Sequence, residues 1–148
     1  MPSRLNPYLN FQGNAREAMT FYHSVFGGDL QTMTFAEGGM EAAPEDAEKL
    51  MHAQLEAPNG MTLMGADSPS GAPPASLSGV QISLSGDDEA ELSGYYEKLA
   101  ESGTVIEPLV RAPWGDQFGM LTDRYGVLWM VNISGSAQGS DSEAADVA

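Results

Sequence analysis

Apolar and polar residues alternate along this chain with two different periods, and the two periods follow each other in the same order twice. Alternation at every second residue is typical of a strand with one buried face. The clearest case is residues 50–56, in which apolar side chains alternate with His52, Gln54 and Glu56. Including this segment, strands are predicted over residues 7–12, 30–35, 50–56, 61–66, 80–85, 105–111, 118–122 and 127–133.

Two further segments repeat apolar residues at the helical spacing of three and four. The first follows Asn14, which together with Glu17 forms an Asn-x-x-Glu capping box, and it stops at the glycine pair 27–28. The second follows Asp88 and stops before Gly103. Each half of the chain is therefore predicted to contain one helix after its first strand.

Both halves read as βαβββ, and the hairpin turn at 58–60 and the glycine turn at 123–126 hold equivalent places in the two halves. The predicted fold class is α+β, with two tandem βαβββ modules whose curved mixed sheets enclose a groove. We place one domain at residues 1–133, with module one at 5–67, a linker at 68–78 and module two at 79–133. Residues 134–148 are small or acidic and are predicted to form a disordered tail.

Charge narrows the classes of partner. The 148 residues include 21 Asp and Glu against 6 Lys and Arg, a net charge of -15. This charge opposes binding to nucleic acid and to anionic membranes. No apolar run approaches the roughly 20 residues that span a bilayer, and no signal-peptide pattern opens the chain. With 0 Cys there is no thiolate site, and the expected location is the cytoplasm.

Several short motifs resemble the vicinal oxygen chelate superfamily, also called the glyoxalase/bleomycin-resistance fold, and in particular its PhnB-like branch. The motifs are Pro7-Tyr8-Leu9, Gly13-Asn14-Ala15, Phe21-Tyr22, His52-Ala53, Trp114-Gly115-Asp116, Phe118-Gly119, Gly126 and Trp129. The resemblance covers roughly residues 5–133. It implies paired modules, often in a homodimer, and a divalent metal held in the groove by residues of the first and last strands of each module.

Matching the repeat and the superfamily pattern places the four ligand positions at Tyr8 (or Pro7), Met64, Gln81 and Met130. Divalent transition metals prefer imidazole, carboxylate or thiolate ligands, and this set offers none of them. We therefore predict that the usual metal site is absent and that no cofactor is required.

Three other residue types have two interpretations each. His52 is either a groove histidine that binds a ligand or acts as a base, or a strand histidine satisfied by its neighbours. Trp114 follows Pro113 in a loop and either walls the groove or packs at a dimer contact, whereas Trp129 is predicted in the core. The 9 Met residues suit an adaptable apolar cavity and equally suit core packing.

Three functions are compatible with these residues. The favoured hypothesis is metal-independent binding of an apolar or aromatic small molecule in the groove, without enzymatic activity. The second is a lyase, isomerase or antibiotic-modifying enzyme with a metal or a base displaced to His52. The third is a dimeric interaction protein. The predicted groove residues are Tyr8, His52, Gln54, Met64, Gln81, Trp114, Phe118 and Met130.

Overall fold

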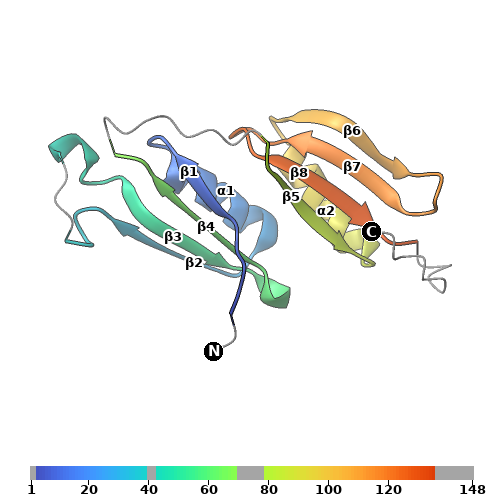
Figure 1. The fold of residues 1–148 in the computed structure, drawn as a ribbon, viewed down its shortest axis with the longest axis horizontal. Coiled ribbons are helices and arrows are strands. Elements are labelled where there is room, and N and C mark those ends of the chain that lie inside the picture. Colours follow the sequence, from blue (N-terminus) through green and yellow to red (C-terminus); the bar gives the residue numbers. More distant parts are fainter. Residues whose placement is uncertain (1–2, 40–42, 70–78, 136–148) are drawn as a thin grey trace. The chain divides into compact units, whose positions relative to one another are not determined.

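The fold consists of two compact units, residues 1–77 and 78–148, in a computed structural model that describes residues 3–39, 43–69 and 79–135. Each unit contains one helix and one four-stranded sheet in the order βαβββ (Figure 1). The predicted α+β class with two βαβββ modules is confirmed. We describe each unit by itself.

The first unit forms a mixed sheet with strand order β1-β4-β3-β2. Its elements are β1 (Tyr8–Phe11), α1 (Ala15–Phe26), β2 (Asp29–Thr34), β3 (Leu50–Glu56) and β4 (Thr62–Asp67), with single 3₁₀ turns at Pro44–Asp46 and Pro58–Gly60. Strand β1 is parallel to β4, and the other neighbours are antiparallel. The predicted hairpin turn is confirmed, because Asn59 and Gly60 have φ values of 68° and 77°.

Helix α1 packs on β2, β3 and β4 and forms the core of the first unit with them. Met19 and Tyr22 of the helix and Leu50 and Leu55 of β3 are fully buried. Each buried side chain of this size contributes roughly 1.5–3 kcal/mol of apolar transfer free energy. His52, Gln54 and Glu56 alternate along β3 with buried Ala53 and Leu55, and they therefore lie on the opposite face of the sheet.

The predicted capping box at the start of α1 is wrong, because the side chain of Asn14 makes no capping hydrogen bond. Asp67, at the end of β4, accepts from the backbone N–H groups of Gly13 at 2.7 Å and Ala15 at 2.9 Å. Its other oxygen accepts from the backbone N–H of Leu50 at 3.0 Å. A residue more than 50 positions away in sequence thus caps the helix and joins it to two strands.

The second unit has the equivalent strand order β5-β8-β7-β6. Its elements are β5 (Gln81–Gly86), α2 (Glu89–Ala100), β6 (Thr104–Arg111), β7 (Gln117–Thr122) and β8 (Leu128–Ile133). The predicted cap of α2 is confirmed, since Asp88 accepts from the N–H of Glu91 at 3.0 Å. Trp129 is 1% exposed, as predicted for a core residue, and its indole N–H donates to buried Asp123 at 2.9 Å.

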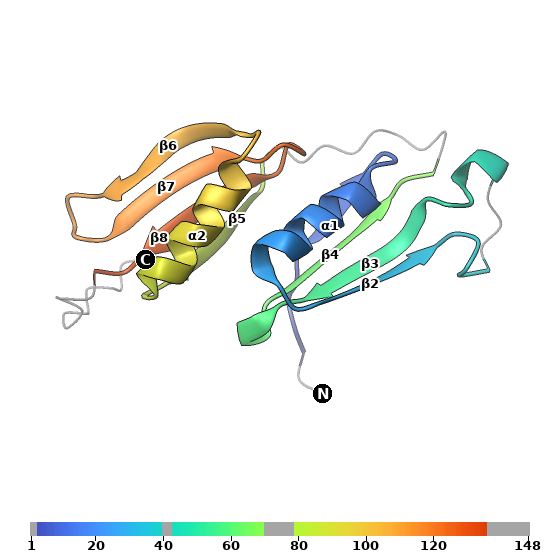
Figure 2. The ribbon, with the colours of Figure 1, turned by 180° about the vertical axis from the view of Figure 1, so that it is seen from behind.

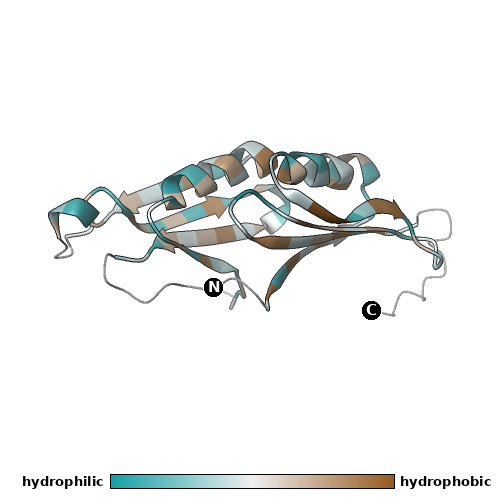
Figure 3. Ribbon diagram, turned by 90° about the horizontal axis from the view of Figure 1, so that it is seen from above, coloured by the Kyte–Doolittle hydropathy of each residue, from teal (hydrophilic) through white to brown (hydrophobic). Residues whose placement is uncertain are grey.

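In both units the helix covers one face of its own sheet, and among the described residues the opposite face carries no helix of that unit (Figures 2 and 3). No helix in the described ranges is long and apolar enough to cross a membrane. Most of the predicted linker and of the predicted acidic tail, residues 70–78 and 136–148, lies outside the described residues.

Candidate functional site

The open face of the first sheet brings three predicted site residues into one row. Tyr8 of β1 lies opposite Met64 of β4, and Met64 lies opposite Gln54 of β3. The row ends at Gln31 of β2, which lies opposite Gln54. Partners in a sheet register share a face. Tyr8, Met64 and Gln54 are therefore neighbours on a surface that faces away from α1.

His52 lies on the same face, two residues along β3 from Gln54 and opposite Met33 of β2. Its Nδ1 atom is 3.0 Å from the hydroxyl oxygen of Tyr8, and the two ring centroids are 5.7 Å apart with an interplanar angle of 39°. Tyr8 is 45% exposed and Met33 is 42% exposed. The imidazole thus has a defined partner while one side of the pair stays open.

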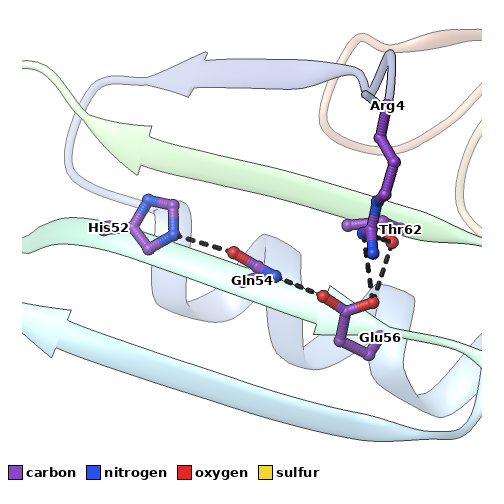
Figure 4. Close-up of polar contacts among 5 residues, drawn as sticks. All are labelled: Arg4, His52, Gln54, Glu56 and Thr62. Atoms are coloured by element: carbon purple, nitrogen blue, oxygen red, sulfur yellow. Dashed lines mark hydrogen bonds and ion pairs between the residues drawn. The ribbon is translucent and has the colours of Figure 1, made fainter. Parts of the chain in front are cut away.

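Hydrogen bonds join six side chains of this face, which we call the Glu56 network. Its members are Arg4, Tyr8, His52, Gln54, Glu56 and Thr62. His52 Nε2 is 3.3 Å from Gln54 Oε1, and the Gln54 amide donates to Glu56 (Figure 4). Thr62 donates to the other oxygen of Glu56 at 2.8 Å. Arg4 donates to Thr62 and lies 3.5 Å from Glu56.

Two groups of this network have shifted pKa values. Hydrogen bonds from Thr62 and from Gln54 lower the pKa of Glu56, and Arg4 contributes further. Burial raises the pKa of Tyr8. At neutral pH Glu56 is therefore an ionised acceptor, and Tyr8 is a neutral phenol that keeps its proton.

The open face of the second sheet combines neutral side chains of β5, β7 and β8 with Glu107 of β6, which lies opposite Met120. Met130 of β8 lies opposite Ser83 of β5 and Met120 of β7, and Phe118 lies opposite Asn132. The predicted residue Gln81 lies on this face too, opposite Leu128 rather than Met130. Met130, Phe118 and Gln81 are therefore brought to one face of the second sheet. Trp114 lies in the loop between β6 and β7 and is 67% exposed.

The side chains at the implied ligand positions do not fit a divalent metal. In the first unit the facing pair is the phenol of Tyr8 and the thioether of Met64. In the second unit it is the hydroxyl of Ser83 and the thioether of Met130. Zn²⁺, Mn²⁺ and Fe²⁺ prefer imidazole or carboxylate donors. Within the described ranges, no three His, Asp or Glu side chains lie close enough together to hold a metal ion.

Sequence reasoning missed Arg4, Thr62 and Ser83 as members of these faces. The position of Thr62 could have been predicted from the sequence, because a tight hairpin turn fixes the register that places it opposite Glu56. Arg4 precedes the first strand, and no local pattern predicts where its side chain lies. Ser83 was missed because the repeat was aligned at glycines, whereas strand register decides which residue faces Met130.

Comparison with known proteins assigns the fold to a family. Residues 4–131 match the family model described as "Glyoxalase/Bleomycin resistance protein/Dioxygenase superfamily". The chain belongs to this superfamily. It is 29% identical to Protein YjdN of Escherichia coli (strain K12) over 141 residues, which cover 87% of this chain and 94% of YjdN.

Two solved structures extend the comparison. Protein PA1353 from Pseudomonas aeruginosa is 40% identical with a TM-score of 0.81, over 90% of this chain and 98% of that one. A Bacillus cereus protein described as "Putative 3-demethylubiquinone-9 3-methyltransferase, PhnB protein" is 26% identical with a TM-score of 0.68, over 89% of this chain and 100% of that one. The predicted resemblance to the PhnB-like branch is thereby confirmed.

Proposed function

We propose that this superfamily member binds an apolar or aromatic small molecule on the open faces of its sheets without using a metal ion. One observation carries the proposal. The face where relatives of this fold are expected to hold a metal presents Met64 and an exposed Tyr8–His52 pair. Methionine adapts to varied apolar shapes, and aromatic rings supply a large contact area.

The second open face supports the same ligand class. Phe118, Met120 and Met130 gather there, and neutral Gln81 and Ser83 supply hydrogen-bonding groups. None of these five side chains carries a charge. A ligand with an aromatic body and few negative charges also agrees with the net charge of -15.

We further propose that the protein is a cytoplasmic homodimer, as the resemblance implies. Exposed apolar side chains of β6 and the following loop support a contact with a second copy. Val110 is 58% exposed and Trp114 is 67% exposed, and Val105 and Ile106 are each 47% exposed. Sedimentation velocity should show a dimer at micromolar concentration, and a monomer throughout that range would contradict the proposal.

Thermal-shift screening against aromatic and antibiotic libraries tests ligand binding. A compound at about 100 times its Kd should stabilise the folded state by about 2.7 kcal/mol. Met64→Asp, which places a carboxylate in the middle of the row, should abolish the shift, whereas Arg16→Ala on the exposed side of α1 should preserve it. Shifts unchanged by Met64→Asp would place the ligand elsewhere, and no shift with any compound would favour an interaction protein.

Elemental analysis tests the metal-independent part of the proposal. Protein purified without a chelator should contain well under one equivalent of any transition metal. A stoichiometric metal would instead support an enzyme with a displaced site near His52. His52→Ala tests whether the imidazole contributes to stability or to ligand binding. Unchanged stability and unchanged binding would show that His52 contributes to neither.

A further inference from the structure

The hydrogen bonds of the Glu56 network have a direction, and this direction starts at Glu56. The carboxylate of Glu56 can only accept, and it accepts from Thr62 on one oxygen and from Gln54 on the other. Gln54 must therefore turn its NH₂ group toward Glu56. Its carbonyl oxygen then faces His52 Nε2 at 3.3 Å.

The orientation of Gln54 determines the tautomer of His52. Because an amide oxygen can only accept, Nε2 of His52 must carry the hydrogen. A neutral imidazole has a single N–H, so Nδ1 is an acceptor. The remaining contact, at 3.0 Å, then requires the Tyr8 hydroxyl to donate to Nδ1. The only hydroxyl hydrogen of Tyr8 is thus directed into the network.

We propose that the Glu56 network holds His52 as the Nε2–H tautomer and makes the Tyr8 oxygen a hydrogen-bond acceptor toward the ligand. The open face of the first sheet then selects aromatic molecules that carry an N–H or O–H donor and disfavours carboxylates and phosphates. The ligand selection rests on the proposed binding function. The tautomer rests on the geometry of the network alone.

The surroundings of Tyr8 agree with this selection. Tyr8 is 45% exposed, so its oxygen can accept from a molecule outside the network. Met64 lies opposite Tyr8, and Met33 lies opposite His52. An aromatic ring can therefore contact thioethers while its donor reaches the phenol oxygen. A ligand acceptor would instead have to compete with His52 for the Tyr8 hydrogen, leaving Nδ1 without its donor.

Long-range ¹H–¹⁵N spectroscopy of the histidine rings tests the tautomer without any ligand. The protein has only 2 His, so a spectrum of His52→Ala assigns both rings. At a pH where the ¹⁵N shifts show a neutral ring, His52 should be protonated at Nε2. Gln54→Leu should convert this single tautomer to a mixture, whereas Gln31→Leu, opposite Gln54 in the same row, should leave it unchanged.

Either of two results would overturn the tautomer assignment. One is protonation at Nδ1 in the unaltered protein, and the other is a Gln54→Leu spectrum identical to the unaltered one. His23 provides an internal reference, because its Nε2 faces the carbonyl oxygen of Gly28 at 2.8 Å and should also carry the hydrogen. Circular dichroism of each variant verifies that the fold is retained.

Titration calorimetry with three matched probes tests the ligand selection. Indole, which has an N–H, should bind about tenfold more tightly than 1-methylindole, since one hydrogen bond distinguishes them. Benzoate should bind most weakly. Tyr8→Phe should remove the preference for indole while 1-methylindole binding stays within about twofold.

The outcomes separate the two proposals. Equal affinity for the two indoles, or tightest binding of benzoate, would refute the acceptor role of Tyr8 and leave the binding function standing. Failure of all three probes to bind would count against the binding function and against the ligand selection together. In that case the histidine spectra still decide whether the network fixes the tautomer.

Discussion

Removing the carboxylate of Asp67 should destabilise the first unit more than removing the side chain of Asn14, the residue that precedes α1. Asp67 accepts backbone N–H groups from Gly13, Ala15 and Leu50. The last two residues are fully buried. In Asp67→Ala both buried donors lose their acceptor, and each such loss costs about 1–3 kcal/mol. The expected loss in the free energy of unfolding is therefore about 2–6 kcal/mol.

Asp67→Asn makes the reasoning more specific. The amide oxygen can still accept from Gly13 and Ala15, but the NH₂ group then faces the N–H of Leu50. One buried donor is left unsatisfied, for an expected cost of about 1–3 kcal/mol. Asn14→Ala is the matched control, because Asn14 makes no side-chain cap. It should change stability by less than about 0.5 kcal/mol, whereas a working cap is worth about 0.5–2 kcal/mol.

Urea denaturation monitored by circular dichroism gives these free energies, and hydrogen exchange locates them. In Asp67→Asn the amide of Leu50 should lose more protection than the amide of Ala15. The reasoning would be refuted if Asn14→Ala cost as much as Asp67→Ala. It would also be refuted if Asp67→Ala cost less than about 1 kcal/mol, since water or another group would then replace the carboxylate.

Three more predictions concern other parts of the chain. Lys49 lies 2.8 Å from Asp46, and the hydrogen bond to Asp46 raises the pKa of Lys49. The stabilisation from this pair is therefore fully present below about pH 10.4, the pKa of an unfolded lysine, and is lost as the pH rises through the raised pKa of Lys49. Lys49→Arg should extend that stability to higher pH in alkaline melting curves. Trp129→Phe should cost about 1–3 kcal/mol in urea denaturation, because the variant loses the 2.9 Å bond to Asp123; no loss would argue against that bond. Trp114→Ala should change stability by less than about 0.5 kcal/mol yet weaken dimerisation in sedimentation, and an unaltered dimer would exclude a contact role.

Local pattern predicted the elements of this fold well, because each strand and helix has its own period and its own turn signals. The strand predicted over residues 50–56 is β3 without a shift, and the cap at Asp88 is present as expected. The capping prediction failed at Asn14 because the side chain that caps α1 is that of Asp67, which is distant in sequence. A sequence window contains no information about which strand end meets a helix start.

In the candidate site, too, the features within one strand were predictable from sequence, and the contacts between distant residues were not. The shared face of His52, Gln54 and Glu56 follows from the two-residue period of one strand. The bond between Tyr8 and His52 joins residues 44 positions apart and depends on the register of three strands. A prediction that is wrong by one residue in such a register places every side chain of the strand on the other face of the sheet.

The two units share the same backbone fold but carry different side chains on the open faces of their sheets. This difference suggests that the two faces contribute differently to the proposed ligand binding. The open face of the first sheet carries a directional network that ends at Tyr8. On the second sheet the equivalent surface presents Phe118 and Met130, which can supply contact area but no fixed donor or acceptor. We therefore expect variants of Phe118 and Met130 to change affinity for all aromatic ligands alike. Variants of the network should instead change which ligands are preferred, because selectivity requires a hydrogen bond whose direction is fixed.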